Sequence, residues 1–286
     1  MECKEDLKEI AQYSKESRQE KYIDRIRYWL SPANPHTNYI RALDMRQSGS
    51  GTWFLQSQQY LRWKSSLEPT LWLHGLAGCG KTVLTSSIIE DLQKMIVSVP
   101  HASSNPILLY FFFDFRDVKK QSLEEMALSL AYQMYSQDEN FQHPLDSLLK
   151  ACDNGYRKPS TASLLEIILE TLLSIDRQVF VILDALDECA IPRRELLAWI
   201  EKVAESSSEG VNVLVTSRKE PDIDSVLGRP RLMDQNIAVQ TDVVDEDIRA
   251  YIIHRLRTDS GFKRWEHRED IQRMIQESLM GMSAGM

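Results

Sequence analysis

The sequence has few cysteines, with only 4 among 286 residues. Cys3, Cys79, Cys152 and Cys189 are scattered and form no C-x-x-C pair, which argues against a disulfide framework and against a zinc site. The first ten residues, MECKEDLKEI, lack the apolar core of a signal peptide. These features fit a reducing compartment, and we predict a cytoplasmic protein.

Long apolar runs and an excess of positive charge are also lacking. The longest apolar run, Ile107–Phe113, is far shorter than the roughly 20 residues that span a bilayer, so we expect no membrane partner. Acidic residues outnumber Lys and Arg by 42 to 34, and the formal net charge is −8. Proteins that bind nucleic acid normally carry a basic surface, so we expect no such partner. The remaining composition, 43% hydrophobic, is that of a globular chain with one large or two modest domains.

The most informative segment is Leu71–Thr82, LWLHGLAGCGKT, because residues 75–82 match the pattern G-x-x-x-x-G-K-[ST]. Gly75 and Gly80 permit backbone angles and close approaches that a Cβ would obstruct. The N–H groups of such a loop converge on phosphate oxygens at a helix N-terminus, while the lysine reaches the β- and γ-phosphates and the hydroxyl ligates Mg²⁺. We therefore predict that ATP or GTP binds with Mg²⁺ at Gly75, Leu76, Ala77, Gly78, Cys79, Gly80, Lys81, Thr82 and Val83.

The residues around the loop predict the strand and helix that this motif requires. Leu71–His74 is a short apolar run typical of a buried strand. After the loop, apolar residues between Val83 and Leu92 recur on one helical face, and Pro100 limits that helix. The alternative is a glycine-rich turn that matches the pattern by chance.

Four further apolar segments, 107–113, 179–183, 211–216 and a weak one at 237–239, are predicted strands. Helices are expected between them, including one at about 122–135, where Ser122 starts a capping-box pattern, and one at about 163–174. Continuous apolar strands separated by helices are typical of a parallel sheet covered on both faces. We predict an α/β fold of the P-loop NTPase type, with three layers α/β/α and about five mainly parallel strands.

Helices are expected at both ends of the chain. Apolar stripes on charged segments predict helices over about 4–30, 38–46 and 58–64, the last carrying Tyr60 and Trp63 toward the core. After residue 241 the pattern is helical, beginning with the acidic residues 245–247. We predict three parts: an N-terminal helical segment (1–48), the NTPase core (49–241) and the start of a helical domain (242–286).

A second candidate site follows the strand predicted at 179–183. Asp184 lies at the carboxyl end of that strand, where α/β sheets bind ligands, and its carboxylate suits Mg²⁺ directly or through water. We expect this strand to neighbour the loop strand, because nucleotide-bound Mg²⁺ needs a partner there. Asp187 and Glu188 are predicted catalytic residues that orient or activate a water for attack on the γ-phosphate. The alternative is ordinary capping of a helix start by acidic residues.

A third candidate site is Thr216-Ser217-Arg218, which ends the strand at 211–215. A polar group there is placed to sense the γ-phosphate, and Arg218 is a catalytic candidate that would stabilise charge on the transferring phosphoryl group. Loops at strand ends often carry chemistry. The alternative is a solvated surface arginine.

In this order, the motifs resemble the NACHT family of STAND nucleoside triphosphatases, especially fungal NACHT proteins of the heterokaryon-incompatibility and ankyrin-repeat kind. The resemblance runs from about Tyr22 to about Met280. The segments that carry it are GTWFLQSQQYLRW (51–63), LWLHGLAGCGKTVL (71–84), LLYFFFDF (108–115), FVILDALDEC (180–189), LVTSRKEPDI (214–223) and DVVDEDIRAYIIHRLRTDSGFKRW (242–265).

The resemblance implies a nucleotide-driven switch, in which exchange or hydrolysis changes how domains pack and a separate effector responds. It assigns the phosphate and Mg²⁺ roles to Lys81 and Thr82, a second Mg²⁺ role to Asp184, and a sensor role to Arg218. In many members of the family a small residue, often glycine, follows the first Asp, so Ala185 is a mild departure. Relatives lead us to expect a winged helix and a repeat array beyond residue 286, so the chain is expected to be either a shortened gene product or a fragment. The last helix has an apolar face with Ile271, Met274, Ile275 and Leu279. This face either packs on the preceding helices or is exposed and promotes self-association or binding of a protein partner.

Three functions remain open from the sequence. The first is a signalling NTPase that binds ATP or GTP and hydrolyses it slowly. The second is a regulatory nucleotide-binding module with little turnover, since the acidic residues are present but their geometry is not given. The third is a small-molecule kinase, which the pair Asp187 and Glu188 disfavours because it suits water activation better than acceptor binding.

Overall fold

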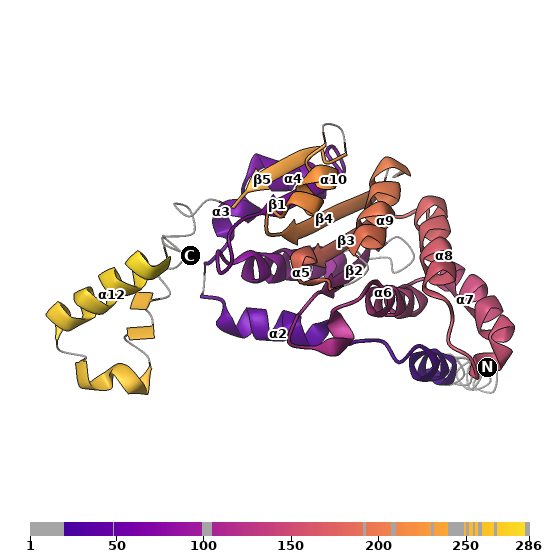
Figure 1. Ribbon diagram of the computed structural model, residues 1–286, viewed down its shortest axis with the longest axis horizontal. Coiled ribbons are helices and arrows are strands. Elements are labelled where there is room, and N and C mark those ends of the chain that lie inside the picture. Colours follow the sequence, from indigo (N-terminus) through magenta and orange to yellow (C-terminus); the bar gives the residue numbers. More distant parts are fainter. Residues whose placement is uncertain are drawn as a thin grey trace, which may run out of the picture.

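A five-stranded parallel sheet lies at the centre of the computed structural model (Figure 1). The structure describes residues 20–47, 49–98, 105–190, 193–206, 210–229, 232–239, 249, 252–253, 255–256, 259–265 and 268–283. The strands are β1 (Thr70–His74), β2 (Ile107–Phe112), β3 (Val179–Asp184), β4 (Val211–Ser217) and β5 (Gln235–Ala238). The helices are α2 (His36–Met45), α3 (Thr52–Leu55), α4 (Gln58–Lys64), α5 (Lys81–Ser98), α6 (Leu123–Gln137), α7 (Glu139–Ala151), α8 (Thr161–Ser174), α9 (Arg193–Ser206), α10 (Pro221–Leu227) and α12 (Glu269–Ser283).

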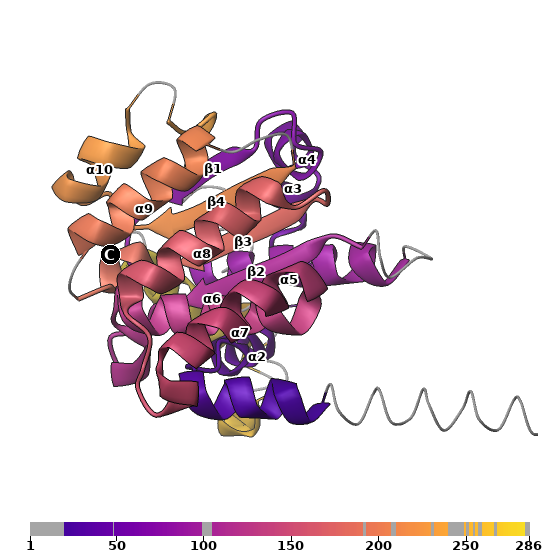
Figure 2. The ribbon, with the colours of Figure 1, turned by 90° about the vertical axis from the view of Figure 1, so that its right-hand side faces the viewer.

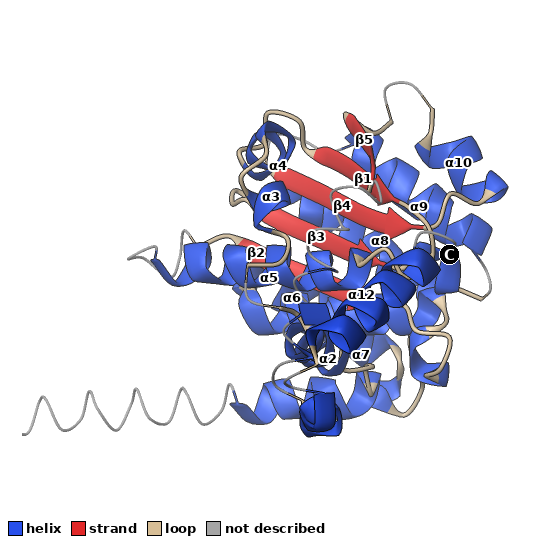
Figure 3. Cartoon of the chain, turned by 90° about the vertical axis from the view of Figure 1, so that its left-hand side faces the viewer, coloured by secondary structure: helices blue, strands red, loops and turns tan. Residues whose placement is uncertain are grey.

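The strands follow the order β2-β3-β4-β1-β5 and lie side by side (Figure 3). Their register aligns His74 at the end of β1 with Ser217 at the end of β4, and Phe112 at the end of β2 with Asp184 at the end of β3. The carboxyl ends of the strands therefore form one edge of the sheet. All five predicted strands are confirmed, and β5 begins two residues before the segment predicted at 237–239.

Helices cover both faces of the sheet, as the continuous apolar strands predict. Trp72 and Val181 face the cluster that includes α6, α8 and α9, and Figure 2 shows these helices lying across the strands. Leu73 and Ile182 face the opposite cluster, which includes α2, α4 and α5. The α/β fold with helices on both faces is therefore confirmed.

Side-chain caps fix where several helices begin. The Ser122 hydroxyl accepts a hydrogen bond from the backbone N–H of Glu125 and starts α6, which confirms the predicted cap. The Ser57 hydroxyl accepts a hydrogen bond from the backbone N–H of Tyr60 and starts α4. Tyr60 and Trp63 in α4 are fully buried, as predicted.

The outer helices are confirmed in part. Residues 20–30 are helical, whereas the predicted helical residues 4–19 and the acidic segment 245–247 lie outside the described residues. Helix α12 lies away from the sheet (Figure 1) and contacts the 3₁₀ segment Ser260–Trp265, and on it Met274 and Leu279 are exposed. Across the part of the chain that the structure describes, no helix has the length and apolar character needed to cross a bilayer.

Candidate functional site

The predicted phosphate loop lies between β1 and α5, at the carboxyl edge of the sheet. Gly75 is the position of close approach, since a Cβ there would lie 2.8 Å from the Cys79 Sγ and 3.1 Å from the Val239 carbonyl oxygen. Gly78 and Gly80 have φ angles of +78° and +81°, which favour glycine. The loop therefore needs its glycines for the reasons that the motif implies.

The other residues of the loop differ in their exposure to solvent. Leu76 and Ala77 are exposed, whereas Cys79 is buried. The Lys81 Nζ lies over the loop and donates hydrogen bonds of 2.8 Å to the carbonyl oxygens of Gly75 and Leu76. Phosphate oxygens are stronger acceptors for an ammonium group than carbonyl oxygens, so this lysine is placed to exchange one set of acceptors for the other.

Asp184 lies beneath the loop and joins it to β3. Its Oδ2 accepts a 2.7 Å hydrogen bond from the Thr82 hydroxyl, and its Oδ1 accepts bonds of 2.7 Å from Thr85 and Thr216. The carboxylate is 1% exposed. Burial raises the pKa of Asp184, and the three hydroxyls together with Lys81 offset part of that shift.

The sheet order corrects one expectation about these strands. We expected β3 to neighbour the loop strand β1, but β4 lies between them. Thr82 still reaches Asp184 because the first turn of α5 starts at this edge of the sheet and because Thr216, at the end of β4, bonds the same carboxylate. A short hydroxyl side chain on β4 thus leaves room for the contact.

The oxygen ligands present suit Mg²⁺ bound together with a phosphate. Thr82 donates its proton to Asp184, which leaves the lone pairs of the threonine oxygen free to ligate a cation. Asp184 is buried behind that hydroxyl, so we expect it to orient the ligand rather than to contact the ion directly. Among the described residues no group of three or more His, Cys, Asp or Glu is arranged to hold a metal ion by itself, and Mg²⁺ commonly relies on one or two protein ligands, phosphate oxygens and water.

Asp187 and Arg218, both predicted as catalytic, lie in contact with each other. The buried Asp187 carboxylate accepts hydrogen bonds from the Arg218 backbone N–H at 2.9 Å and from the Arg218 Nε at 2.5 Å. Arg193 also donates to the Asp187 carbonyl oxygen at 2.6 Å. These bonds occupy both carboxylate oxygens of Asp187 and fix Arg218 beside the end of β3.

Glu188 has a different environment. Its Oε2 accepts a 3.0 Å hydrogen bond from the backbone N–H of Phe115, which follows β2. Burial raises the pKa of Glu188, the Phe115 N–H opposes part of that shift, and the charges of Asp187, Asp114 and Asp184 add to it. A half-buried carboxylate with a raised pKa is better suited to accept a proton than the fully bonded Asp187.

Two residues of this site were not predicted from the sequence: Thr85, which bonds Asp184, and Arg193, which bonds the backbone of Asp187. Thr216 belongs to the third predicted site, and its hydroxyl bonds Asp184. Thr85 lies three residues after Thr82, on the same face of α5, and this spacing is a signal that the sequence did contain. The position of Arg193 has no such signal, because it depends on how α9 packs near α10.

Ala185, between Asp184 and the predicted catalytic residues Asp187 and Glu188, has a left-handed backbone with φ 60° and ψ 51°. This conformation favours glycine, since it costs other residues roughly 1–2 kcal/mol. We expect Ala185→Gly to change the free energy of unfolding by less than about 1 kcal/mol, because relief of strain is offset by the larger unfolded-state entropy of glycine. Ala185→Val is expected to destabilise by more than about 2 kcal/mol, because β-branched residues are severe outliers here.

Urea denaturation of both variants measures these differences. Ala151→Val, at an exposed helical position, is the matched control and is expected to cost only about 0.5 kcal/mol. Equal stability of the two valine variants would contradict a left-handed conformation at residue 185.

The loop, the sheet and the bond between Thr82 and Asp184 are those of a P-loop-like α/β module. Residues 49–218 match the family model described as "Nephrocystin 3, N-terminal", and the chain belongs to this family.

A curated relative gives a second comparison. The vegetative incompatibility protein HET-E-1 of Podospora anserina is 31% identical to the chain over 183 residues. The match covers 61% of this chain and 13% of that protein, so the chain spans a small part of the relative's length. The two comparisons confirm the resemblance to NACHT proteins of the fungal incompatibility kind, and the chain is a NACHT-like module.

Proposed function

We propose that this module binds a nucleoside triphosphate, ATP or GTP, with Mg²⁺ at residues 75–83 and hydrolyses it slowly as the switch of a signalling protein. The observation that carries the proposal is the 2.7 Å hydrogen bond between Thr82 and Asp184, 102 positions apart in the chain. It brings the hydroxyl of the phosphate loop and the carboxylate that ends β3 into one site. The resemblance to NACHT proteins supports switching rather than rapid turnover.

Each residue of the site would have a distinct role in binding or hydrolysis. Loop N–H groups and Lys81 hold the phosphates, and Thr82 holds Mg²⁺, oriented by Asp184. When bound, the metal ion neutralises charge on the β- and γ-phosphates. Glu188 orients a water and accepts its proton, and Arg218 stabilises negative charge at the phosphoryl group from its place beside Asp187.

Titration calorimetry with ATP and with GTP, each with Mg²⁺, tests the proposal. Nucleotide that remains bound on purification is first identified by mass spectrometry and removed. We expect one nucleotide to bind at one site per chain, and binding to weaken when Mg²⁺ is replaced by a chelator. Heat changes equal to buffer dilution for both nucleotides would contradict the proposal.

The switch would act through a protein partner or through a second copy of the chain. Exposed apolar side chains on α12, including Met274 and Leu279, support this extension of the proposal. A cytoplasmic location, the three-part division of the chain at residues 48 and 241, and the absence of nucleic-acid and membrane partners remain predictions.

A further inference from the structure

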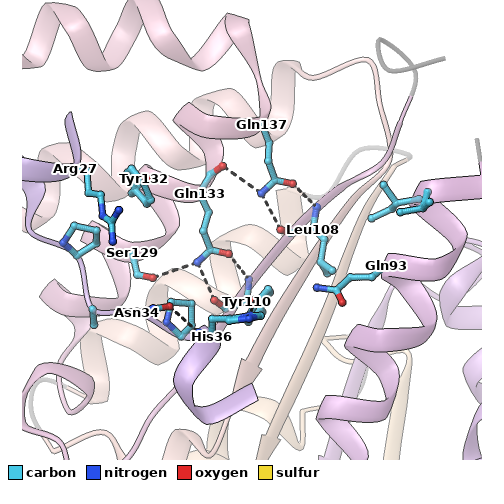
Figure 4. Close-up of a pocket in the computed structure, with 15 residues that line it drawn as sticks. Arg27, Asn34, His36, Gln93, Leu108, Tyr110, Ser129, Tyr132, Gln133 and Gln137 are labelled. Carbon is cyan, nitrogen blue, oxygen red and sulfur yellow. Dashed lines mark hydrogen bonds between the residues drawn. The ribbon is translucent and has the colours of Figure 1, made fainter. Parts of the chain in front are cut away.

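A second hollow lies beside the outer edge of β2, away from the phosphate loop (Figure 4). Its volume is about 670 Å³, within the range of small-molecule sites. Its walls come from residues 27–36, the last turns of α5, β2 and α6. Gln93 on its wall follows Lys81 by 12 residues in α5, about 18 Å along a helix, so the cavity is separate from the phosphate loop.

Two glutamines of α6 close the β2 edge within this cavity. The Gln133 amide donates to the Tyr110 carbonyl oxygen at 2.9 Å and accepts from the Tyr110 N–H at 3.0 Å. One turn later, the Gln137 amide donates to the Leu108 carbonyl oxygen at 3.0 Å and accepts from the Leu108 N–H at 3.3 Å (Figure 4). Because these amides replace a neighbouring strand, the edge is protected against strand addition. The cavity therefore suits a small molecule better than an added peptide strand.

Other side-chain acceptors of the cavity are also occupied. The Asn34 Oδ1 accepts from the His36 N–H at 2.9 Å, and the Gln93 Oε1 accepts from the Tyr39 hydroxyl at 2.9 Å. Within the described part of the chain, the amide nitrogens of Asn34 and Gln93 and the guanidinium of Arg27 have no hydrogen-bond partner. Arg27 and Asn34 are exposed, so these donors face solvent and are available to a ligand that is rich in acceptors.

The charged residues that line the cavity also favour a ligand rich in hydrogen-bond acceptors. Its lining includes Arg27 and His36 but no Asp or Glu, in a chain with a formal net charge of −8. Asp24, one turn before Arg27, lines a neighbouring hollow together with that arginine, and no ion pair joins the two among the described residues. Apolar side chains, Ile96 and Leu108 among them, complete the walls. An acidic protein thus has a cavity whose lining includes an arginine and a histidine but no carboxylate.

We propose that this cavity binds a small organic anion, with a carboxylate or phosphate head that meets Arg27 and the amide of Asn34, which lie on the same side of the cavity (Figure 4). The body of the ligand is compact and apolar and lies against Ile96 and Leu108. The site is independent of the phosphate loop, because Arg27 and Gln93 do not contact the residues predicted to hold the nucleotide.

A charge-matched set of probes tests this proposal. Binding of 2-naphthoate, 2-naphthyl phosphate, the neutral 2-naphthamide and the cationic 2-naphthylmethylammonium is measured by ligand-observed NMR at equal concentrations. We expect one or both anions to bind, the amide to bind at least about tenfold more weakly, and the cation weakest, because a charged hydrogen bond contributes about 1.5–3 kcal/mol. The ranking of the two anions decides which head group the cavity takes.

Variants locate the binding. Arg27→Met is expected to weaken binding of the tighter-binding anion about tenfold. Val97→Trp, at an 85% exposed position on the cavity wall, is expected to block binding of that anion. Lys21→Met removes an exposed charge from the same helical segment as Arg27 and is the matched control, expected to leave binding unchanged. Circular dichroism confirms that each variant is folded.

The loop variant Lys81→Ala separates this site from the nucleotide site. The proposal expects probe binding to survive Lys81→Ala and to survive saturation with MgATP or MgGTP. Equal affinity for the anions and the amide, loss of binding in Lys81→Ala but not in Arg27→Met, or failure of both anions to bind would each overturn it. None of these outcomes depends on whether the module hydrolyses nucleotide.

Discussion

Lys81→Ala is expected to weaken binding of ATP or GTP at least about a hundredfold. The ammonium group lies over the loop, within 2.8 Å of two loop carbonyl oxygens, and is the charge placed to meet the β- and γ-phosphates. Two charged hydrogen bonds of about 1.5 kcal/mol each correspond to about a hundredfold in affinity. Titration calorimetry with Mg²⁺ present measures the loss.

Two further variants make this result specific. Lys94→Ala removes a lysine from the other end of α5, where the side chain pairs with Glu90, and is expected to leave nucleotide affinity unchanged. Lys81→Arg keeps the charge but changes its shape, and we expect partial recovery at most, since the two cations are not interchangeable. Unaltered affinity in Lys81→Ala would refute the assignment of the loop.

Glu188→Gln is expected to slow single-turnover hydrolysis by about 10²–10⁴-fold, the usual contribution of a general base, while nucleotide affinity stays close to that of the unmodified protein. Asp187→Asn is expected to affect hydrolysis through Arg218 and not through loss of the base. Both Asp187 oxygens bond Arg218, and the variant disturbs the position of that arginine. Glu124→Gln, at an exposed position in the first turn of α6, is the matched control and should retain the full rate. Rates at background in the unmodified protein would favour the alternative of a binding module without turnover.

The pH dependence of the rate provides a second readout for Glu188. A general base must be ionised, so the rate is present above the pKa of Glu188 and is lost as the pH falls through it. Burial raises that pKa above the ordinary value of 4.5, so the acid limb is expected above pH 4.5. The residual rate of Glu188→Gln should lack this limb, and an identical profile in both proteins would exclude Glu188 as the base.

Local patterns determined much of the fold. The apolar runs of β1 to β4 and the cap at Ser122 act within a few residues, and each lies where the sequence predicted it. Helix α7 was not predicted. It contains Pro144, which removes a backbone donor, and it is held by the buried side chains of Phe141, Leu145 and Leu149 against the rest of the core. Packing of this kind is not visible in a local window.

The sequence by itself predicts the ligand class of the loop, since glycine at residues 75 and 80, Lys81 and Thr82 stand at fixed spacing along the chain. Only the tertiary structure decided that Asp184 meets Thr82 and which partners Glu188 and Arg218 take. The sheet order places β4 between β1 and β3, so Thr216 joins Thr82 on one buried carboxylate. It also pairs Arg218 with Asp187 and leaves Glu188 to the backbone of Phe115. Spacing along one chain fixes a loop, whereas contacts between distant strands depend on the order in which the strands pack.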